Sequence, residues 1–174
     1  MDKIAIYCSA SPDAPREFNE AATALAAALC KKGYGIVSGG SFLGTMGAVS
    51  DGAASAQGYH KGVLPRFMDG LEYGNLSELV WTETMSARKE EMRRGTVASI
   101  ALPGGIGTLD ELVEVLVLKK LRQYDGRVIA LNLNGFFAPL QRLLDHYVAT
   151  GMLMKEDRQL LEVFDTPEEL LRTF

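Results

Sequence analysis

Three glycines stand close together in a segment that is suited to hold a phosphate: Gly104, Gly105 and Gly107. The apolar residues 97–102 before them are typical of a buried parallel strand, and the apolar residues 112–118 after them are typical of a buried helix. A glycine-rich turn from a strand into a helix presents free backbone N–H groups at the positive end of the helix dipole, and both attract a phosphate. Glycine also lets the backbone approach a ligand closely.

Two side chains of the same segment carry polar groups toward this turn. We expect Thr108 to cap the helix and offer its hydroxyl, and Glu111 to lie in the first helical turn, about one turn beyond the phosphate-facing amides. The segment is not a Walker loop, because no Gly-Lys-Ser/Thr follows the last glycine, and its glycine spacing is not that of the dinucleotide fingerprint. A tight turn before an ordinary capped helix remains the alternative interpretation.

A second glycine-rich segment spans residues 38–47, after a predicted strand at 34–37. Its functional interpretation is a second set of N–H groups, with the Ser41 hydroxyl facing the same pocket. The alternative is that small residues here, and in the predicted helix 48–56, only let the helix pack close to the sheet. A small-residue turn at 9–12 follows the first predicted strand, and ligands bind at this carboxyl edge in open α/β sheets. Two glycine loops at such an edge favour the ligand site.

The predicted helix 85–94 begins with two cations, Arg88 and Lys89, in its first turn. Cations at a helix N-terminus oppose the helix dipole, which is a mild penalty that an anionic ligand would offset. A solvated charged helix face is the alternative from the local sequence.

Strand and helix patterns alternate along the whole chain. This alternation implies a parallel sheet with helices on both faces, and right-handed crossovers make it a doubly wound, Rossmann-like α/β fold of about six to seven strands. At 174 residues, with no linker or repeat, we expect one nucleotide-binding domain over residues 1–174. The predicted strands are 3–8, 34–37, 59–65, 78–82, 97–102, 127–132 and 160–164, and the further helices are 15–32, 112–124, 136–150 and a C-terminal helix that Thr166 caps.

The composition limits the partners and the compartment. A net charge of −4 disfavours nucleic-acid binding, although a local group of N–H donors can still bind a small phosphorylated ligand. Cys8 and Cys30 are the only cysteines, so we expect reduced thiols in a cytoplasmic protein. No signal peptide and no apolar stretch long enough to span a membrane are apparent.

Two segments carry apolar side chains that we expect to contact a ligand or a partner. The predicted helix 112–124 is apolar nearly all round its first half, so we expect it to pack against a second copy in a homodimer. The predicted loop 66–77 contains Phe67, Met68 and Tyr73, which we expect to cover a pocket or a partner surface.

Three segments together are similar to those of a known enzyme family. Residues 103–111 fit the signature PGGxGTxxE, residues 88–92 fit the segment RKxxM, and residues 38–47 are similar to an upstream glycine-rich loop. Residues 62–65, Gly-Val-Leu-Pro, also match. The chain thus resembles, over nearly its whole length, the LOG family of cytokinin riboside 5′-monophosphate phosphoribohydrolases, which are often labelled lysine decarboxylases.

The sequence departs from the family pattern at a few positions. Ser86 stands where a histidine is common, and the upstream loop is one residue longer, with Ser38 in place of a glycine. Leu118 and Lys120 stand where the family has a tryptophan and a glutamine. The resemblance therefore implies an intact site for phosphate and ribose, with a base pocket that differs.

The resemblance implies hydrolysis of the N-glycosidic bond of a purine nucleoside 5′-monophosphate, AMP or an N6-modified AMP, to free base and ribose 5-phosphate. Loss of the base leaves oxocarbenium-like charge on the ribose, which a carboxylate stabilises while it activates water. Glu111 and Arg88 are the expected catalytic residues, with Arg88 holding the substrate and assisting the departing base. The expected substrate-binding residues are Ser41, Met85, Lys89, Gly104, Gly105, Ile106, Gly107, Thr108 and Asp110.

No metal or cofactor is expected. His60 and His146 lack a cluster of further ligands, and no lysine is singled out for the pyridoxal phosphate that lysine decarboxylation requires. A nucleotide-binding sensor or carrier that uses the same pocket without turnover is the alternative function. The presence of both Glu111 and Arg88 favours the enzyme, because binding alone needs no acid beside a phosphate.

Overall fold

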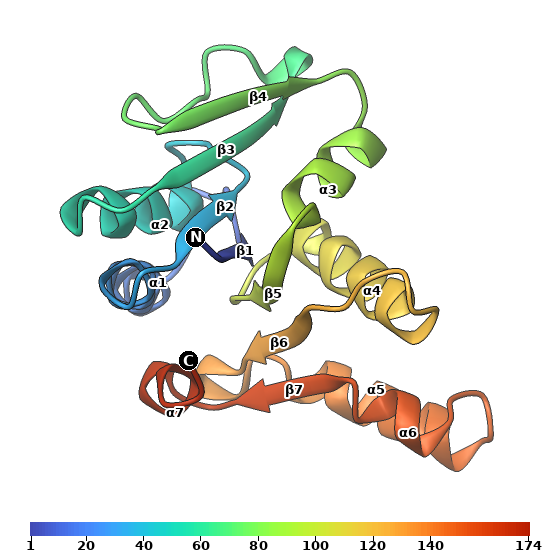
Figure 1. The fold of residues 1–174 in the computed structure, drawn as a ribbon. Coiled ribbons are helices and arrows are strands. Elements are labelled where there is room, and N and C mark those ends of the chain that lie inside the picture. The colour runs from blue at the N-terminus through green and yellow to red at the C-terminus, as the bar shows by residue number, and fades with distance from the viewer.

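Seven strands form one fully parallel sheet at the centre of the molecule (Figure 1). The computed structural model describes all 174 residues. The strand order is β4-β3-β2-β1-β5-β6-β7. The strands are β1 (Lys3–Tyr7), β2 (Gly35–Ser38), β3 (His60–Pro65), β4 (Glu78–Thr82), β5 (Thr96–Ala101), β6 (Arg127–Leu131) and β7 (Leu161–Phe164).

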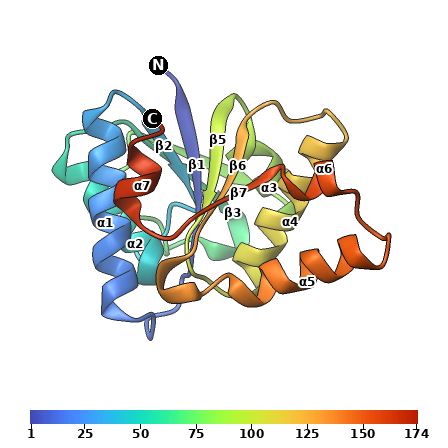
Figure 2. The ribbon, with the colours of Figure 1, turned by 90° about the horizontal axis from the view of Figure 1, so that it is seen from below.

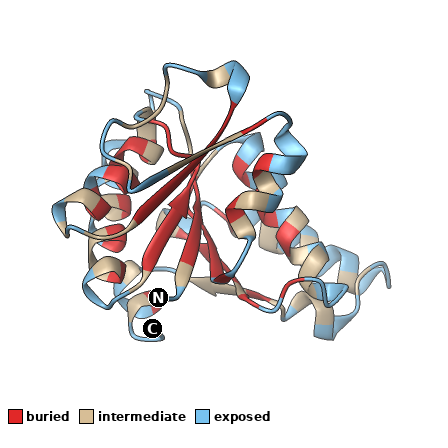
Figure 3. Ribbon diagram, turned by 45° about the horizontal axis from the view of Figure 1, so that its top comes forward, coloured by how far each residue is buried: buried red, intermediate tan, exposed pale blue.

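Helices cover both faces of this sheet, so the doubly wound α/β prediction is confirmed. On one face lie α1 (Arg16–Lys31), α2 (Gly44–Ser55) and α7 (Pro167–Leu171), and on the other lie α3 (Met85–Arg93), α4 (Ile106–Lys120) and α5 (Ala138–Ala149) (Figures 1 and 2). The central strands are apolar on both sides because each side meets helices, and they form the buried centre in Figure 3. No helix combines the length and the apolar character needed to cross a bilayer.

The first strand, β1, lies at the point where the sheet reverses its direction of growth. One neighbour is β2, reached through α1, and the other is β5, reached only after β4 and α3. Connections leave β1 and β5 on opposite faces, so their carboxyl ends diverge and leave a crevice between them. The turn from β5 into α4 is therefore placed at the position where open α/β sheets bind ligands.

The start of α4 differs from the sequence prediction. Gly105 is the N-cap and α4 begins at Ile106, so Thr108 is the third helical residue rather than the cap, and Glu111 lies in the second turn. The helix ends at Lys120, four residues before the predicted end, because Arg122 takes a left-handed φ of 58°. Because a glycine such as Gly107 occurs in a first helical turn as well as in a loop, the sequence pattern placed the start of this helix too late.

Three other segments also differ from prediction. The helix α2 begins at Gly44 and not at Ala48, so the second glycine loop is shorter than expected. Within the predicted loop 66–77 a short 3-10 helix spans Arg66–Met68, and α6 (Lys155–Arg158) was not predicted because four residues show no helical period. The predicted cap of α7 is confirmed, since Oγ1 of Thr166 accepts the N–H of Glu169 at 3.2 Å.

Candidate active site

A cleft of about 240 Å³ opens at the carboxyl ends of β1 and β5, where the fold predicts a ligand. It brings together seven of the residues expected from the sequence with four that were not. The expected ones are Met85, Arg88, Gly105, Gly107, Thr108, Asp110 and Glu111, and the others are Cys8, Ser9, Ala10 and Met46. A larger and more open depression of about 510 Å³ lies between α1 and α2; it contains none of the expected catalytic or substrate-binding residues, although Tyr73 of the loop 66–77 lines it.

The turn from β5 into α4 carries a row of free N–H donors, and three of its residues, Gly105, Gly107 and Thr108, line this cleft. No acceptor in the protein takes the backbone N–H of any residue from Gly104 to Thr108; the first bond of the helix is from Leu109 to the Gly105 carbonyl at 3.1 Å. Five consecutive donors at a helix N-terminus form a concave site for an anion. Gly104 is needed here because a Cβ on it would lie 2.2 Å from Oγ1 of Thr108.

Arg88 is buried at the inner wall of the cleft. Thr84 caps α3 by accepting the N–H of Ala87 at 3.1 Å, and this start of the helix directs Arg88 toward the sheet. Its Nε–H donates to the Val63 carbonyl at 2.9 Å, and its Nη1–H donates to Oε1 of Glu111 at 3.1 Å. The Glu111 carboxylate thus offsets the unfavourable position of this cation in the first turns of α3, where the sequence suggested an anionic ligand.

Glu111 is the carboxylate that faces Arg88, and only 6% of it is exposed. Burial raises the pKa of Glu111 to about 7, and the positive charge and hydrogen bond of Arg88 offset only part of that increase. At neutral pH both protonation states of Glu111 are therefore populated. That is the property of a group that takes up and returns a proton during a reaction.

Lys89 points away from the cleft, although it was expected to bind substrate. Its Nζ lies 2.8 Å from Oδ2 of Asp110 and also contacts Glu114, which in turn accepts from Arg93 at 2.8 Å. These ion pairs connect α3 to α4 directly behind Arg88 and Glu111. Lys89 therefore joins the two helices that carry the central pair, which leaves Asp110 alone of these charges in the lining of the cleft.

Several other expected residues lie elsewhere. Ser41 is fully buried and its Oγ accepts the N–H of Leu43 at 3.2 Å, so its hydroxyl does not face the cleft. Ile106 is 87% exposed and does not line the cleft, although its backbone N–H is one of the free donors of the turn. Leu118 packs at the edge of the core, and Lys120 pairs with Asp157 at 3.0 Å; neither lines the cleft of one chain.

The unexpected residues of the cleft come from two places. Cys8, Ser9 and Ala10 follow β1, and their position at the carboxyl edge of the central strand was the available signal in the sequence. Met46 lies in the first turn of α2, and no local pattern in the sequence indicated it. Burial raises the pKa of the Cys8 thiol, so Cys8 forms a small uncharged wall rather than a nucleophile.

Comparison with known proteins agrees with this geometry. The model of a family described as possible lysine decarboxylase matches residues 46–174. A cytokinin riboside 5′-monophosphate phosphoribohydrolase of Mycobacterium marinum is 37% identical over 171 residues, which are 97% of this chain and 91% of that protein. The cytokinin riboside 5′-monophosphate phosphoribohydrolase LOG of Oryza sativa subsp. japonica is 33% identical over 174 residues, which are 97% of this chain and 71% of that protein.

Solved structures share the fold at lower identity. The molybdenum cofactor carrier protein of Chlamydomonas reinhardtii superposes with a TM-score of 0.76 at 20% identity, covering 99% of this chain and 94% of that one. At this identity the likeness extends to the fold alone. The signature residues in the cleft, the match to the family model and the full-length relatives together show that this chain belongs to the LOG family of phosphoribohydrolases.

Proposed function

We propose that this chain hydrolyses the N-glycosidic bond of a purine nucleoside 5′-monophosphate, AMP or an N6-modified AMP, and releases the free base and ribose 5-phosphate. The observation that carries the proposal is the buried pair of Arg88 and Glu111 beside a row of free N–H donors. The distance from an anion site at a helix start to a carboxylate in the second turn is suited to a ribose that carries a 5′-phosphate. The names of the relatives point to the same reaction.

In the proposed reaction, the phosphate accepts hydrogen bonds from the N–H groups of the turn after β5. As the bond from C1′ to the base nitrogen breaks, positive charge develops on the ribose, and the Glu111 carboxylate stabilises it. Water adds its oxygen to C1′ and gives a proton to Glu111, whose pKa of about 7 suits this transfer. The leaving base takes up a proton from solvent while Arg88 stabilises the developing negative charge on it, and Glu111 then releases its proton to solvent.

Lysine decarboxylation, which the family description mentions, is not what these residues favour. A Schiff base to pyridoxal phosphate needs a lysine whose amine loses its proton easily. Burial lowers the pKa of Lys89, but its hydrogen bonds and ion pairs with Asp110 and Glu114 outweigh burial, and the net pKa is raised. Lys61, the most buried lysine, lies outside the cleft and pairs with Glu91.

A direct test is chromatography of AMP and of isopentenyl-AMP after incubation with the purified protein. The proposal predicts free base and ribose 5-phosphate in equal amounts from at least one of them. It also predicts slower release from adenosine, which lacks the phosphate that the turn binds. Nucleotide binding without any release of base would instead support the sensor or carrier alternative, and no binding at all would contradict both.

We also propose that the chain forms a homodimer through the outer face of α4. Leu109, Val113 and Val117 are each more than 40% exposed on this face. Beside them an apolar groove of about 140 Å³ lies between α4 and α5.

The size of the active-site cleft also favours a dimer. A cleft of 240 Å³ is smaller than the ~300–1,000 Å³ typical of ligand pockets, so a nucleotide extends beyond it toward the start of α4. A second copy on α4 would cover that extension.

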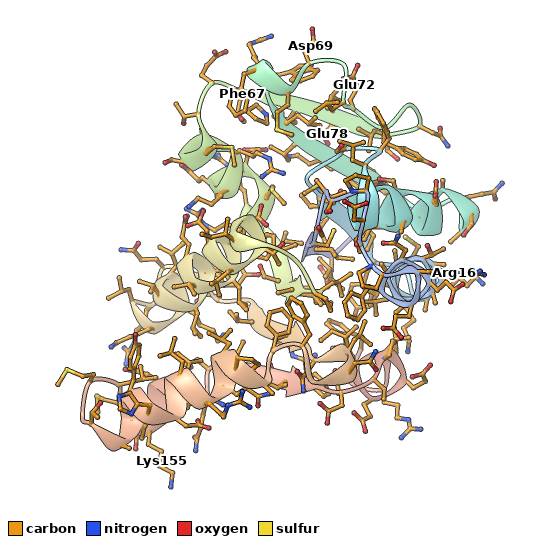
Figure 4. All side chains as sticks on the ribbon, turned by 180° about the vertical axis from the view of Figure 1, so that it is seen from behind. Arg16, Phe67, Asp69, Glu72, Glu78 and Lys155 are labelled. Carbon is orange, nitrogen blue, oxygen red and sulfur yellow. The ribbon has the colours of Figure 1, made fainter.

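Light scattering tests this assembly with a matched pair of variants. Val117→Asp places a charge in the centre of the apolar face and is expected to give monomers at micromolar concentration. Phe67→Asp makes the same kind of change in a side chain that is 73% exposed on the loop after β3, and Figure 4 shows this side chain at the edge of the molecule. We expect the Phe67 variant to remain dimeric, and a monomeric wild type would contradict the proposal.

A further inference from the structure

We propose that the buried pair of Ser38 and His60 positions Arg88 for catalysis by holding the end of β2 against β3. The kinetic part of its test rests on the proposed function, because Arg88 is given a role there. Neither side chain touches the cleft, so the pair acts through other residues and is not catalytic itself.

The two side chains form a link between neighbouring strands. Oγ of Ser38 lies 2.7 Å from Nε2 of His60, and the residues are 0% and 2% exposed. The ladder between β2 and β3 ends where Ser38 lies opposite Gly62. Beyond that point the chain continues as Gly39 and Gly40, and a Cβ on Gly40 would lie only 2.7 Å from Cα of Gly62. Glycines cannot link β2 to β3 through side chains, so Ser38, the last residue of β2, makes the side-chain hydrogen bond to β3 that precedes this glycine contact.

The end of β2 and the turn after it lie on one side of the Arg88 guanidinium. Oγ of Ser38 accepts the N–H of Gly40 at 3.1 Å and thereby fixes a turn in which Gly40 has a φ of +71°. Within this turn Gly39 lies directly against the guanidinium, because a Cβ on Gly39 would be 2.3 Å from Nη2 of Arg88. The hydroxyl that His60 orients thus determines how closely the turn approaches Arg88.

The middle of β3 lies on the other side of the Arg88 guanidinium. Val63 follows Gly62, and its carbonyl accepts the Nε–H of Arg88 at 2.9 Å. The guanidinium therefore lies between Gly39 at the end of β2 and Val63 in β3, with Glu111 as its third contact at 3.1 Å. A separation of the end of β2 from β3 would shift Arg88 relative to Glu111.

The chemistry of His60 indicates a role beyond filling space. Burial lowers its pKa to about 4, so the ring is neutral at pH 7. Its Nδ1 is buried without a hydrogen-bond partner in the protein. An unpaired buried polar atom reduces stability, and an apolar side chain of similar size would avoid that cost. The only partner of the ring is Ser38, which makes this hydrogen bond the feature that an apolar residue would not reproduce.

The kinetic test compares four variants in the assay of base release. Ser38→Ala removes the hydroxyl, His60→Leu removes the ring nitrogens, and His60→Gln returns an amide near the position of Nε2. The control is Ser99→Ala, which removes an equally buried strand hydroxyl that contacts Tyr7 and Tyr124 instead. A small misplacement of Arg88 is expected to lower kcat about tenfold in the first two variants while KM changes less than about twofold. His60→Gln and Ser99→Ala should keep kcat within about twofold of the wild type.

A second readout needs no turnover. In protein labelled with ¹⁵N-arginine, the Nε–H of Arg88 is buried and bonded to Val63, so its exchange with solvent is slow. We expect this exchange to be about tenfold faster in Ser38→Ala and His60→Leu, and unchanged in His60→Gln and Ser99→Ala. If the wild type releases no base from any nucleotide, the proposed function fails, while the exchange rates still decide the positioning role.

Two results would overturn the inference. One is an unchanged kcat together with an unchanged Arg88 exchange rate in both Ser38→Ala and His60→Leu. The other is an equal effect of Ser99→Ala on both quantities, which would show that any lost buried hydroxyl loosens the site.

Discussion

The two glycine-rich turns of this protein have similar compositions and different uses. In the turn after β5, the N–H groups from Gly104 to Thr108 have no partner in the protein, and Gly105, Gly107 and Thr108 line the cleft. In the turn after β2, Ser41 accepts the N–H of Leu43, and the N–H of Met46 donates to the Ser9 carbonyl at 3.0 Å. The N–H groups of the turn after β5 are therefore free to bind a ligand, whereas several N–H groups of the turn after β2 are used in hydrogen bonds within the protein.

The glycines of the turn after β2 allow close packing of the backbone. A Cβ on Gly44 would lie 2.3 Å from the Ser11 carbonyl oxygen, and one on Gly47 would lie 2.2 Å from that of Phe42. By contrast, in the turn after β5, a Cβ added to Gly105 or Gly107 would have no atom within 4 Å. Glycine content alone therefore does not identify a phosphate site; the distinction is whether the donors and the space around them are already occupied.

The largest expected effect on activity comes from substitution of Arg88, which contacts Gly39 in the turn after β2 and Glu111 in α4. Arg88→Ala removes the contact to Gly39 on one side and to Glu111 on the other, and we expect base release to fall by about 10³-fold. Without the positive charge, the pKa of Glu111 should rise further above 7, so the remaining activity shifts to higher pH. The pH dependence of kcat/KM measures both effects, and an unshifted profile would show that the two groups are not coupled.

The protonation of Glu111 gives the next largest effect, on stability. Its ordinary pKa of 4.5 is raised to about 7 in the folded protein, so the folded state binds an extra proton between these pH values. Wild-type stability therefore decreases as pH rises through that window, by at most about 3 kcal/mol. Glu111→Gln does not titrate, so its stability relative to wild type should rise from pH 4.5 to 7 and stay constant above. Urea unfolding at several pH values measures this difference, and a flat difference would refute the raised pKa.

A proline substitution sharpens the comparison of the turns. Ile106 is the first residue of α4, where proline is tolerated, and Gly105 before it is extended, as a residue before proline prefers. Ile106→Pro thus removes one free N–H while keeping the helix, and we expect affinity for ribose 5-phosphate to fall about tenfold. Ile106→Ala is the control that keeps the N–H, and calorimetric titration compares the two. Equal affinities would mean that this donor does not bind the phosphate.

The smallest effect is expected in the turn after β2. Ser41→Ala removes the hydroxyl that accepts from Leu43, which is expected to cost about 1 kcal/mol of stability. Because the hydroxyl does not face the cleft, KM for the nucleotide should stay within about twofold of the wild type. A large increase in KM with unchanged stability would restore Ser41 as a phosphate ligand.

Much of the fold was predictable from local patterns. Apolar runs bounded by glycine turns identify the strands, and their alternation with helices implies the parallel sheet. The choice of Arg88 and Glu111 as candidate catalytic residues followed from the resemblance to the family, whereas their ion pair was not predicted. The ion pairs of Lys89 with Asp110 and Glu114 were not predicted, because they depend on how α3 packs against α4.

What remained unpredictable depends on contacts between distant segments. Met46 enters the cleft only because α2 begins at Gly44, next to the loop after β1. His60 meets Ser38 across two strands that are 22 residues apart in sequence, which no local period indicates. Ser41 could not be separated from a phosphate ligand by residue type, since a serine in a glycine loop suits both roles.

The most direct test of the account is release of adenine from AMP by the wild type and by Glu111→Gln, with nucleotide affinity measured on both proteins. We predict that the wild type releases free base and ribose 5-phosphate. The variant should bind AMP with similar affinity and turn it over at least about 10²-fold more slowly. If Glu111→Gln releases base as fast as the wild type, Glu111 is not the group that supports the reaction, and the mechanism proposed for this cleft is wrong.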